Sequence, residues 1–117
     1  MYKAEYRQQE HDSRLTYLVN HLDEIGINRD NIISIIREPV WTPYGKNGDF
    51  HTLCDLLCLD WNNGGYCVEL KHSWTQRGKA RRQLLSGEEY MQDILNRSYS
   101  QRIIAIYTPD SFEYEMV

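Results

Sequence analysis

Hydrophobic residues recur at helical spacing in two parts of the chain, and each part predicts an amphipathic helix. The first helix is expected over residues 10–25, with Gly26 at its end and a start as early as Lys3 also allowed. The second helix is expected over residues 75–96. Its sheet-facing stripe consists of Ala80, Leu84, Gly87, Met91 and Ile94. Because Gly87 has no side chain, it would let this helix approach a sheet closely.

Short runs rich in β-branched and aliphatic residues predict strands between and after the helices. These strands cover residues 31–40, 53–60, 66–72 and 102–109, with a further short strand at 111–117. Residues 41–51 contain one proline and two glycines and are expected to form an exposed loop. The order α-β-β-β-α-β predicts an α/β fold in which helices flank a mixed sheet. A length of 117 residues suits one domain.

Composition and charge restrict the function classes. The net charge of −4 argues against non-specific adhesion to nucleic acid but leaves room for a local basic patch. No run of eighteen or more apolar residues is present, and the polar start is unlike a signal peptide, so no membrane association and an intracellular location are expected. That location is the cytoplasm or, for a viral protein, the host cytoplasm.

Three cysteines, Cys54, Cys58 and Cys67, lie in the predicted hairpin without a CxxC pair. An odd number of cysteines does not favour a disulfide framework, and free cysteines in strands are most often small buried hydrophobic residues. A zinc site formed by His51, Cys54 and Cys58 is conceivable, but the spacing matches no common ligand pattern. We therefore expect all three thiols to be buried packing residues.

Charged residues interrupt this hairpin. Side chains alternate along a strand, so Glu69 and Lys71 share one face. Asp55 joins them only if the turn around Asn62-Asn63-Gly64-Gly65 has an odd length or a one-residue bulge, which these residues tolerate. An ordinary ion pair between Glu69 and Lys71 on a solvated strand is the alternative.

Convergence of these side chains would have a specific chemistry. Two neighbouring carboxylates resist ionising together unless a cation lies between them. Hard oxygen ligands select Mg²⁺ or Mn²⁺. A lysine beside such a cation can orient or deprotonate a water that attacks a phosphodiester and can offset the developing charge.

Asp55 followed by Glu69-Leu70-Lys71, on a hairpin between two helices, resembles the PD-(D/E)XK nuclease superfamily. The predicted element order also matches its common core, and in size and layout the chain is most similar to archaeal Holliday-junction resolvases and small viral nucleases. Cys54 stands where many members have a proline. The resemblance implies a single restriction-endonuclease-like domain over residues 1–117 that hydrolyses DNA as a homodimer. Asp55 and Glu69 would bind Mg²⁺, for which Mn²⁺ can substitute, and Lys71 would support the attacking water.

The superfamily often adds a glutamate from the first helix to the metal site, and a glutamine or lysine from the helix after the motif. Glu10 is the candidate for the first role, and Glu5 or Asp12 could replace it, because all three flank the apolar stripe. For each acid taken singly, the favoured alternative is a solvated residue near the helix start. Gln83 and Lys79 are the candidates for the second role. Their polar edge of the helix, Gln76, Lys79, Gln83 and Tyr90, should face the sheet side that bears Glu69.

Basic residues cluster directly after the motif. The cluster consists of Arg77, Lys79, Arg81 and Arg82. Cations at a helix start oppose its dipole, so they make more sense if nucleic-acid phosphates dock there. The alternative is a solvated basic face neutralised by acids such as Glu88 and Glu89.

Two other functions stay open. One is a non-catalytic nucleic-acid-binding module or complex subunit with the same fold. The other is a protein-interaction domain, because nine tyrosines and three tryptophans against two phenylalanines suit a partly wet aromatic surface.

Overall fold

A computed structural model describes residues 3–41, 51–52 and 54–117 of the chain. It contains a five-stranded sheet with the order β1-β4-β5-β6-β7. These strands are β1 Ile32–Arg37, β4 Leu56–Asp60, β5 Gly65–Lys71, β6 Gln101–Tyr107 and β7 Phe112–Met116. Only β5 and β6 pair in parallel, and the other neighbours are antiparallel. A separate two-stranded pair joins β2 Val40–Trp41 to β3 His51–Thr52.

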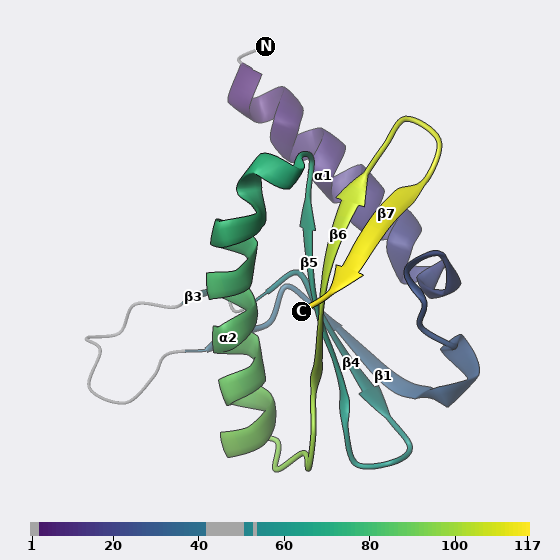
Figure 1. The fold of residues 1–117 in the computed structure, drawn as a ribbon, viewed down its shortest axis with the longest axis vertical. Helices are drawn as coiled ribbons and strands as arrows, with labels where there is room; N and C mark the ends of the chain where they lie inside the picture. The colour runs from purple at the N-terminus through teal and green to yellow at the C-terminus, as the bar shows by residue number, and fades with distance from the viewer. Residues whose placement is uncertain (1–2, 42–50, 53) are drawn as a thin grey trace.

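Two helices cover opposite faces of the sheet, α1 Lys3–Val19 and α2 Arg77–Asp93 (Figure 1). The alternation of side chains along β5 divides the core between them. Val68 and Leu70 pack on the α1 side, together with Leu15 and Leu18. Cys67 packs on the α2 side with Ala80, Leu84 and Met91. The prediction of an α/β fold with a mixed sheet flanked by helices is therefore confirmed, and β5 occupies the centre of the sheet.

The helix ends differ from the predicted ones. The first helix does begin at Lys3, but it ends at Val19, and a separate 3₁₀ turn, η1 Leu22–Ile25, follows. This turn keeps Leu22 and Ile25 buried after the α-helix has stopped. Gly26 ends it in the left-handed conformation with φ 81°, as glycine allows.

The second helix is shorter than residues 75–96 because a 3₁₀ turn, η3 Trp74–Gln76, precedes α2. The helix stops at Asp93, so Ile94 is 38% exposed and does not continue the buried stripe. Our placement of Ile94 in the core was therefore wrong. Gly87 does face the sheet: a Cβ built on it would lie 3.1 Å from Cys54 Sγ and 3.3 Å from Cys67 Sγ.

The strand expected over residues 31–40 divides into two. A short 3₁₀ turn, η2 Arg29–Asn31, leads into β1, which ends at Arg37. Glu38 then adopts a φ of 50°, which lies outside the β region, so the strand ends there. Pro39 separates Glu38 from β2. Residues 42–50 of the expected loop lie outside the described part of the chain.

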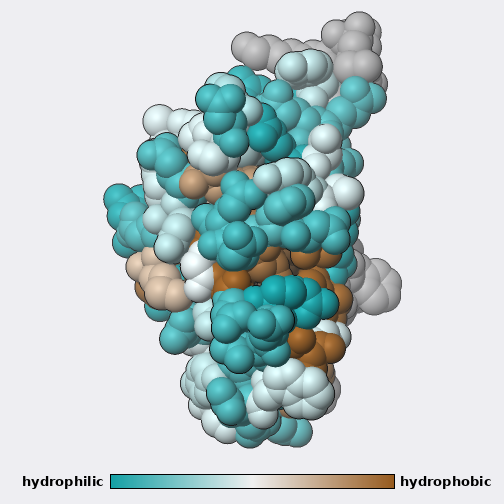
Figure 2. Space-filling view, turned by 90° about the vertical axis from the view of Figure 1, so that its right-hand side faces the viewer, coloured by the Kyte–Doolittle hydropathy of each residue, from teal (hydrophilic) through white to brown (hydrophobic). Residues whose placement is uncertain are grey.

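The surface is mixed in character. Figure 2 shows a mostly hydrophilic face with a band of hydrophobic residues across its middle. Large hydrophobic side chains with at least 40% exposure include Ile33, Trp61, Leu85 and Met116. No helix among the described residues is long and apolar enough to cross a membrane.

Candidate functional site

The turn between β4 and β5 has an odd length. Leu59 pairs with Gly65, and the backbone N–H of Asp60 donates to the carbonyl of Gly64 at 3.0 Å. Three residues, 61–63, therefore close the turn, and Asn63 adopts the left-handed conformation with φ 65°. The regular pairing of β4 with β5 ends at Leu56 and Val68. Because the backbone N–H of Asp55 also donates to the Val68 carbonyl, two residues of this strand face Val68, as in a β-bulge. The carboxyl groups of Asp55 and Glu69 are nevertheless close enough to influence each other's pKa.

Asp55 lies where β4 and β5 separate, one residue before β4 begins. Its backbone N–H donates to the carbonyl of Val68 at 3.0 Å, and its Oδ2 accepts the backbone N–H of Leu70 at 2.7 Å. The Asp55 carboxylate thus accepts the Leu70 N–H at a point where β4 supplies no backbone carbonyl. Asp55 is 7% exposed, so it is recessed but still reachable.

Glu69 is more deeply buried, with 2% exposure, on the side covered by α2. Its Oε2 lies 3.2 Å from Lys71 Nζ, whereas its Oε1 has no hydrogen-bond partner among the described residues. Burial, and then the neighbouring Asp55 carboxylate, raise the pKa of Glu69 to about 8, and Lys71 offsets this only in part. Glu69 therefore keeps its proton at neutral pH, as expected for two carboxyl groups that cannot both ionise.

Asp55 carries the negative charge of the pair. Burial, the largest single influence, acts to raise the pKa of Asp55, but the hydrogen bond and charge of His11 outweigh it. Bonds from Glu69 and from the N–H of Leu70 act in the same direction as His11, and the pKa of Asp55 is lowered. The two carboxyl groups are thus unequal, one ionised and one protonated.

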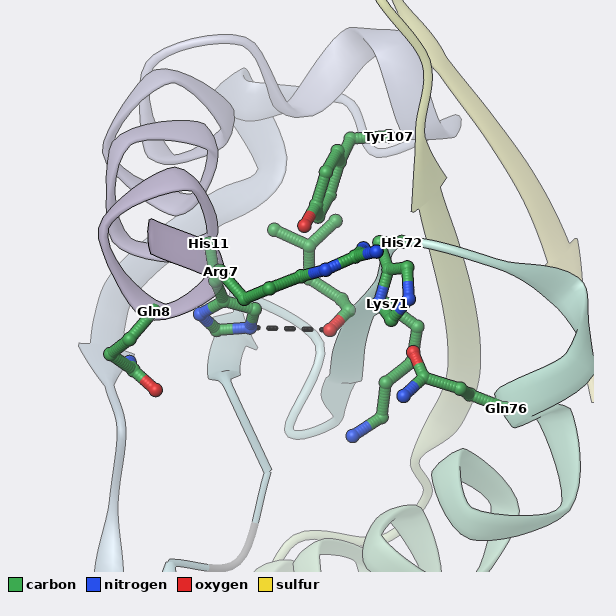
Figure 3. Close-up of a pocket in the computed structure, with 8 residues that line it drawn as sticks. Arg7, Gln8, His11, Lys71, His72, Gln76 and Tyr107 are labelled. Atoms are coloured by element: carbon green, nitrogen blue, oxygen red, sulfur yellow. Dashed lines mark hydrogen bonds between the residues drawn. The ribbon is translucent and has the colours of Figure 1, made fainter. Parts of the chain in front are cut away.

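His11 is the residue that sequence reasoning missed. It projects from α1, and its Nε2 lies 3.2 Å from Asp55 Oδ2 and 3.2 Å from the carbonyl oxygen of Leu70 (Figure 3). Both oxygens are acceptors, so Nε2 carries a hydrogen that they share. The hydrogen bond to Asp55 raises the pKa of His11 despite its partial burial. A signal for His11 was present, because it precedes Leu15 by four residues and therefore lies on the apolar stripe.

The first-helix acids do not take that place. Glu10 instead lies near Tyr107, whose pKa is raised to about 12 by burial and by a hydrogen bond with Glu10. Asp12 lies 3.7 Å from His11 Nδ1 and joins Glu38 and His11 in a group whose ligand-type atoms all lie within 4.8 Å of one another. This group is half open to solvent, where acids often gather without a cation. The side chain of Glu5 lies outside the described residues.

Four buried polar atoms lack a hydrogen-bond partner in the described part of the chain. They are His11 Nδ1, Glu69 Oε1, Gln76 Oε1 and Gln83 Oε1. Gln76 belongs to η3 and Gln83 to α2, and both are partly buried, whereas Lys79 is exposed. Buried polar atoms are normally satisfied, so each exception marks a place for water, an ion or a ligand.

The basic cluster is partly neutralised from β7. Arg77 forms a close ion pair with Glu115 and also lies 5.7 Å from the ring centre of Trp74. Arg81 Nη2 is 3.7 Å from the same Glu115 carboxylate. The neutralising acid is thus Glu115, whereas Glu88 pairs with Arg102 at 3.5 Å. Lys79 and Arg82 are exposed on the same helix.

The cysteines are buried and free, as expected. Cys54 packs on the α2 side of the sheet, and Cys58 packs on the α1 side. These two thiols therefore cannot ligate one zinc ion, and the side chain of His51 lies outside the described residues. The interpretation as packing residues is confirmed.

Comparison with known proteins adds no name to this site. No family model matches the chain, and neither a curated protein nor a solved structure matches it. The resemblance to the PD-(D/E)XK superfamily therefore depends on the residues and on the order of the elements.

Proposed function

We propose that this chain is a metal-dependent nuclease that hydrolyses phosphodiester bonds of DNA, as an endonuclease. One observation carries the proposal: a single hydrogen on His11 Nε2 is shared between Asp55 Oδ2 and the Leu70 carbonyl, each 3.2 Å away. Three ligand-type atoms from three parts of the chain thus converge on one point. Glu69, whose carboxyl group interacts with that of Asp55, adds an oxygen that lacks a hydrogen-bond partner among the described residues.

The donor set suits a divalent cation. Two carboxylates and a carbonyl oxygen are ligands that Mg²⁺ and Mn²⁺ accept, and an imidazole nitrogen tips the set toward the transition metal, Mn²⁺. A cation there would remove the reason for the raised pKa of Glu69, because it would stabilise both carboxylates in their ionised form. Asp55, Glu69 and the Leu70 carbonyl would hold it, and His11 would join them once its Nε2 has lost its hydrogen.

The remaining chemistry comes from residues of the chain. When bound, the cation supplies Lewis-acid activation of the phosphate and a lowered pKa for an attacking water. Lys71 Nζ, 3.2 Å from Glu69 Oε2, would position that water and offset the charge that develops on the phosphate. Gln83, with an unsatisfied buried oxygen on α2, would orient the same water or the substrate. The Asp55 contact with His11 fixes the imidazole.

A cleavage assay tests the proposal. Plasmid, single-stranded and branched DNA are incubated with EDTA, Mg²⁺ or Mn²⁺ and the wild-type chain. We expect the wild-type chain to cleave DNA in Mg²⁺ or Mn²⁺ but not in EDTA. Lys71→Ala and Glu69→Gln should each lower the cleavage rate at least about 100-fold, because each removes transition-state stabilisation. Glu113→Gln, an exposed glutamate on β7, is the matched control and should cleave like wild type. Equal activity of Glu69→Gln and Glu113→Gln would overturn the assignment.

A second function is favoured by one observation. Lys71 contacts Glu69 Oε2 without any cation, so the two side chains can form a self-sufficient hydrogen-bonded pair in a non-catalytic nucleic-acid-binding module. Such a module would bind nucleic acid in a salt-sensitive manner and cleave no substrate with any cation.

The resemblance to the nuclease superfamily also implies a homodimer. Light scattering of the purified chain measures its oligomeric state and tests that prediction.

A further inference from the structure

Two neighbouring cavities open beside the site. The first, about 320 Å³, is lined by His11, Leu70 and Lys71 of the site itself. The second, about 310 Å³, reaches Arg14 and Thr108. Both are also lined by the same three side chains, Arg7, His72 and Tyr107. The cavities therefore meet across these side chains and form one groove, which runs along α1 to the end of β6. It begins at His11 and Lys71, the side chains that contact Asp55 and Glu69.

The sequence of α1 explains why this groove is polar. Leu15 and Leu18 bury the C-terminal half of its inward stripe, but at the preceding positions the stripe continues with His11 and Arg7. Figure 3 shows Arg7 reaching from α1 across the cavity toward His72, with Tyr107 above them. A helix face that turns from apolar to basic beside the sheet is adapted to a polar ligand.

Charge distinguishes this groove from the basic cluster on α2. Among the described residues, no acid forms an ion pair with Arg7, and Arg14 is held by the Pro109 carbonyl and lies 5.6 Å from the ring centre of Tyr107. Arg77 and Arg81, in contrast, already share the carboxylate of Glu115. Glu10 is the acid beside the second cavity, and it is engaged by Tyr107. An incoming phosphate would therefore meet fewer competing acids at Arg7 than at Arg77.

Accepting the proposed nuclease function, we infer that this groove binds the backbone of an unpaired nucleic-acid strand and leads it to Asp55. Arg7 contacts the phosphate nearest the site, and Arg14 contacts one farther along. His72 and Tyr107 offer ring surface to the sugar or base. A basic groove with rings is how single strands are bound without sequence preference.

The depth of the acids favours an unpaired strand over a duplex. Asp55 is 7% exposed and Glu69 is 2% exposed, so a phosphate must enter a recess to reach them. Each cavity is close to the lower size limit of small-molecule pockets, about 300 Å³. Such a recess admits one nucleotide of a separated strand, whereas the two strands of a rigid duplex would remain at its rim.

Fluorescence anisotropy tests the inference. A labelled DNA strand of about 12 nucleotides and a hairpin duplex of the same strand are titrated with protein in Ca²⁺. Denaturing gels confirm that the probes stay intact. We expect Arg7→Gln to weaken single-strand binding about tenfold, the loss of one charge-assisted hydrogen bond, and to lower the salt slope by about 0.7. Arg29→Gln, an exposed arginine before β1, is the control with equal charge loss and should change affinity less than about twofold.

The outcomes separate the groove from the nuclease. Tighter binding of the single strand than of the duplex, dependent on Arg7, supports the groove even if the wild-type chain cleaves nothing, in which case only the proposed nuclease fails. Affinity that is insensitive to Arg7→Gln overturns the groove even if the chain cleaves DNA. A larger effect of Arg81→Gln than of Arg7→Gln also overturns it and moves the interface to α2. Equal affinity for the duplex refutes the unpaired strand as ligand.

Discussion

Two buried acids, Asp60 and Glu69, lie at opposite ends of the β4–β5 hairpin. Asp60 is 4% exposed, and its Oδ1 accepts the N–H groups of Asn62 at 2.8 Å and Gly64 at 2.9 Å. Its Oδ2 accepts the hydroxyl of Tyr99. Burial acts to raise the pKa of Asp60, but these donors outweigh it and lower the pKa. Glu69, with similar exposure, has one oxygen without a partner in the described residues and a raised pKa.

The difference shows that burial alone does not tell a structural acid from a functional one. Hydrogen-bond donors of the turn and of Tyr99 contact Asp60, so the fold itself stabilises its negative charge. Glu69 lies beside Asp55 and has too few donors, so the fold does not stabilise its ionised form. Hydrogen-bond satisfaction, more than depth, is the informative property.

Substitution of the two acids should give the largest difference in the free energy of unfolding. Asp60→Ala leaves the N–H groups of the turn unsatisfied and should lower the free energy of unfolding by about 2–3 kcal/mol. Glu69→Gln replaces a protonated carboxyl group with a neutral amide. At pH 4.5, below the range in which the unfolded chain gains from ionising Glu69, it should change the free energy of unfolding by less than about 1 kcal/mol. Urea unfolding at pH 4.5 measures both. Equal destabilisation would show that Glu69 is also a structural acid.

A divalent cation should stabilise the fold through Glu69, at the open end of the hairpin, and not through Asp60 at the turn. Mn²⁺ at about 100 times its dissociation constant should raise the free energy of unfolding by about 2.7 kcal/mol. Glu69→Gln and His11→Ala should reduce this gain, whereas Asp60→Asn should retain it, because Asp60 is occupied by the turn. Thermal unfolding with and without Mn²⁺ gives the comparison. A gain that survives in Glu69→Gln would place the cation elsewhere, for instance at Asp12 and Glu38.

The pH dependence of stability should be opposite for the two acids. The unfolded chain loses the Glu69 proton near pH 4.5, but the fold holds it to about pH 8, so stability is lost as the pH rises through this range. The slope reaches about 1.4 kcal/mol per pH unit, and the raised pKa of His11 acts in the same direction. Asp60, with its lowered pKa, loses its contribution as the pH falls below its ordinary value of 3.8.

Unfolding curves between pH 4 and 9 measure this dependence in wild type and in Glu69→Gln. The variant should show a flatter decline, because it has no proton to retain. A decline of unchanged steepness in Glu69→Gln would assign the titration to another group.

An exposed ion pair should give the smallest effect. Arg77 is 47% exposed and Glu115 is 30% exposed, so solvent screens their attraction. Arg77→Gln should lower the free energy of unfolding only slightly, and the loss should shrink further in high salt. A loss as large as that of Asp60→Ala would mean that the pair fixes β7 onto α2.

The parts of the site that follow from local geometry were predictable. Glu69 and Lys71 share a face because strands have a period of two, and the same alternation makes the position of Asp55 depend on the length of the turn or on a bulge. His11 was missed because a histidine on an apolar stripe is usually a packing residue, and only its contact with Asp55 distinguishes it.

Long-range pairing set the limit of prediction. Glu115 reaches Arg77 because β7 folds back beside β6, and the contact joins residues 38 positions apart. Nothing in the local pattern of α2 encodes that partner. The same applies to Glu10, whose neighbour Tyr107 belongs to a strand at the far end of the chain.

The symmetry of the hairpin arms has an evolutionary consequence. Asp60 and Gly64 are hydrogen-bonded partners at the turn. Asp55 lies five residues before Asp60, and Glu69 lies five residues after Gly64. Single insertions or deletions in one arm would therefore separate the acids, whereas substitutions between them would not. Descendants of this chain can vary the residues of the arms widely, but they can change arm length only in matched pairs. Alignment gaps, more than identities, should reveal which relatives have kept the site.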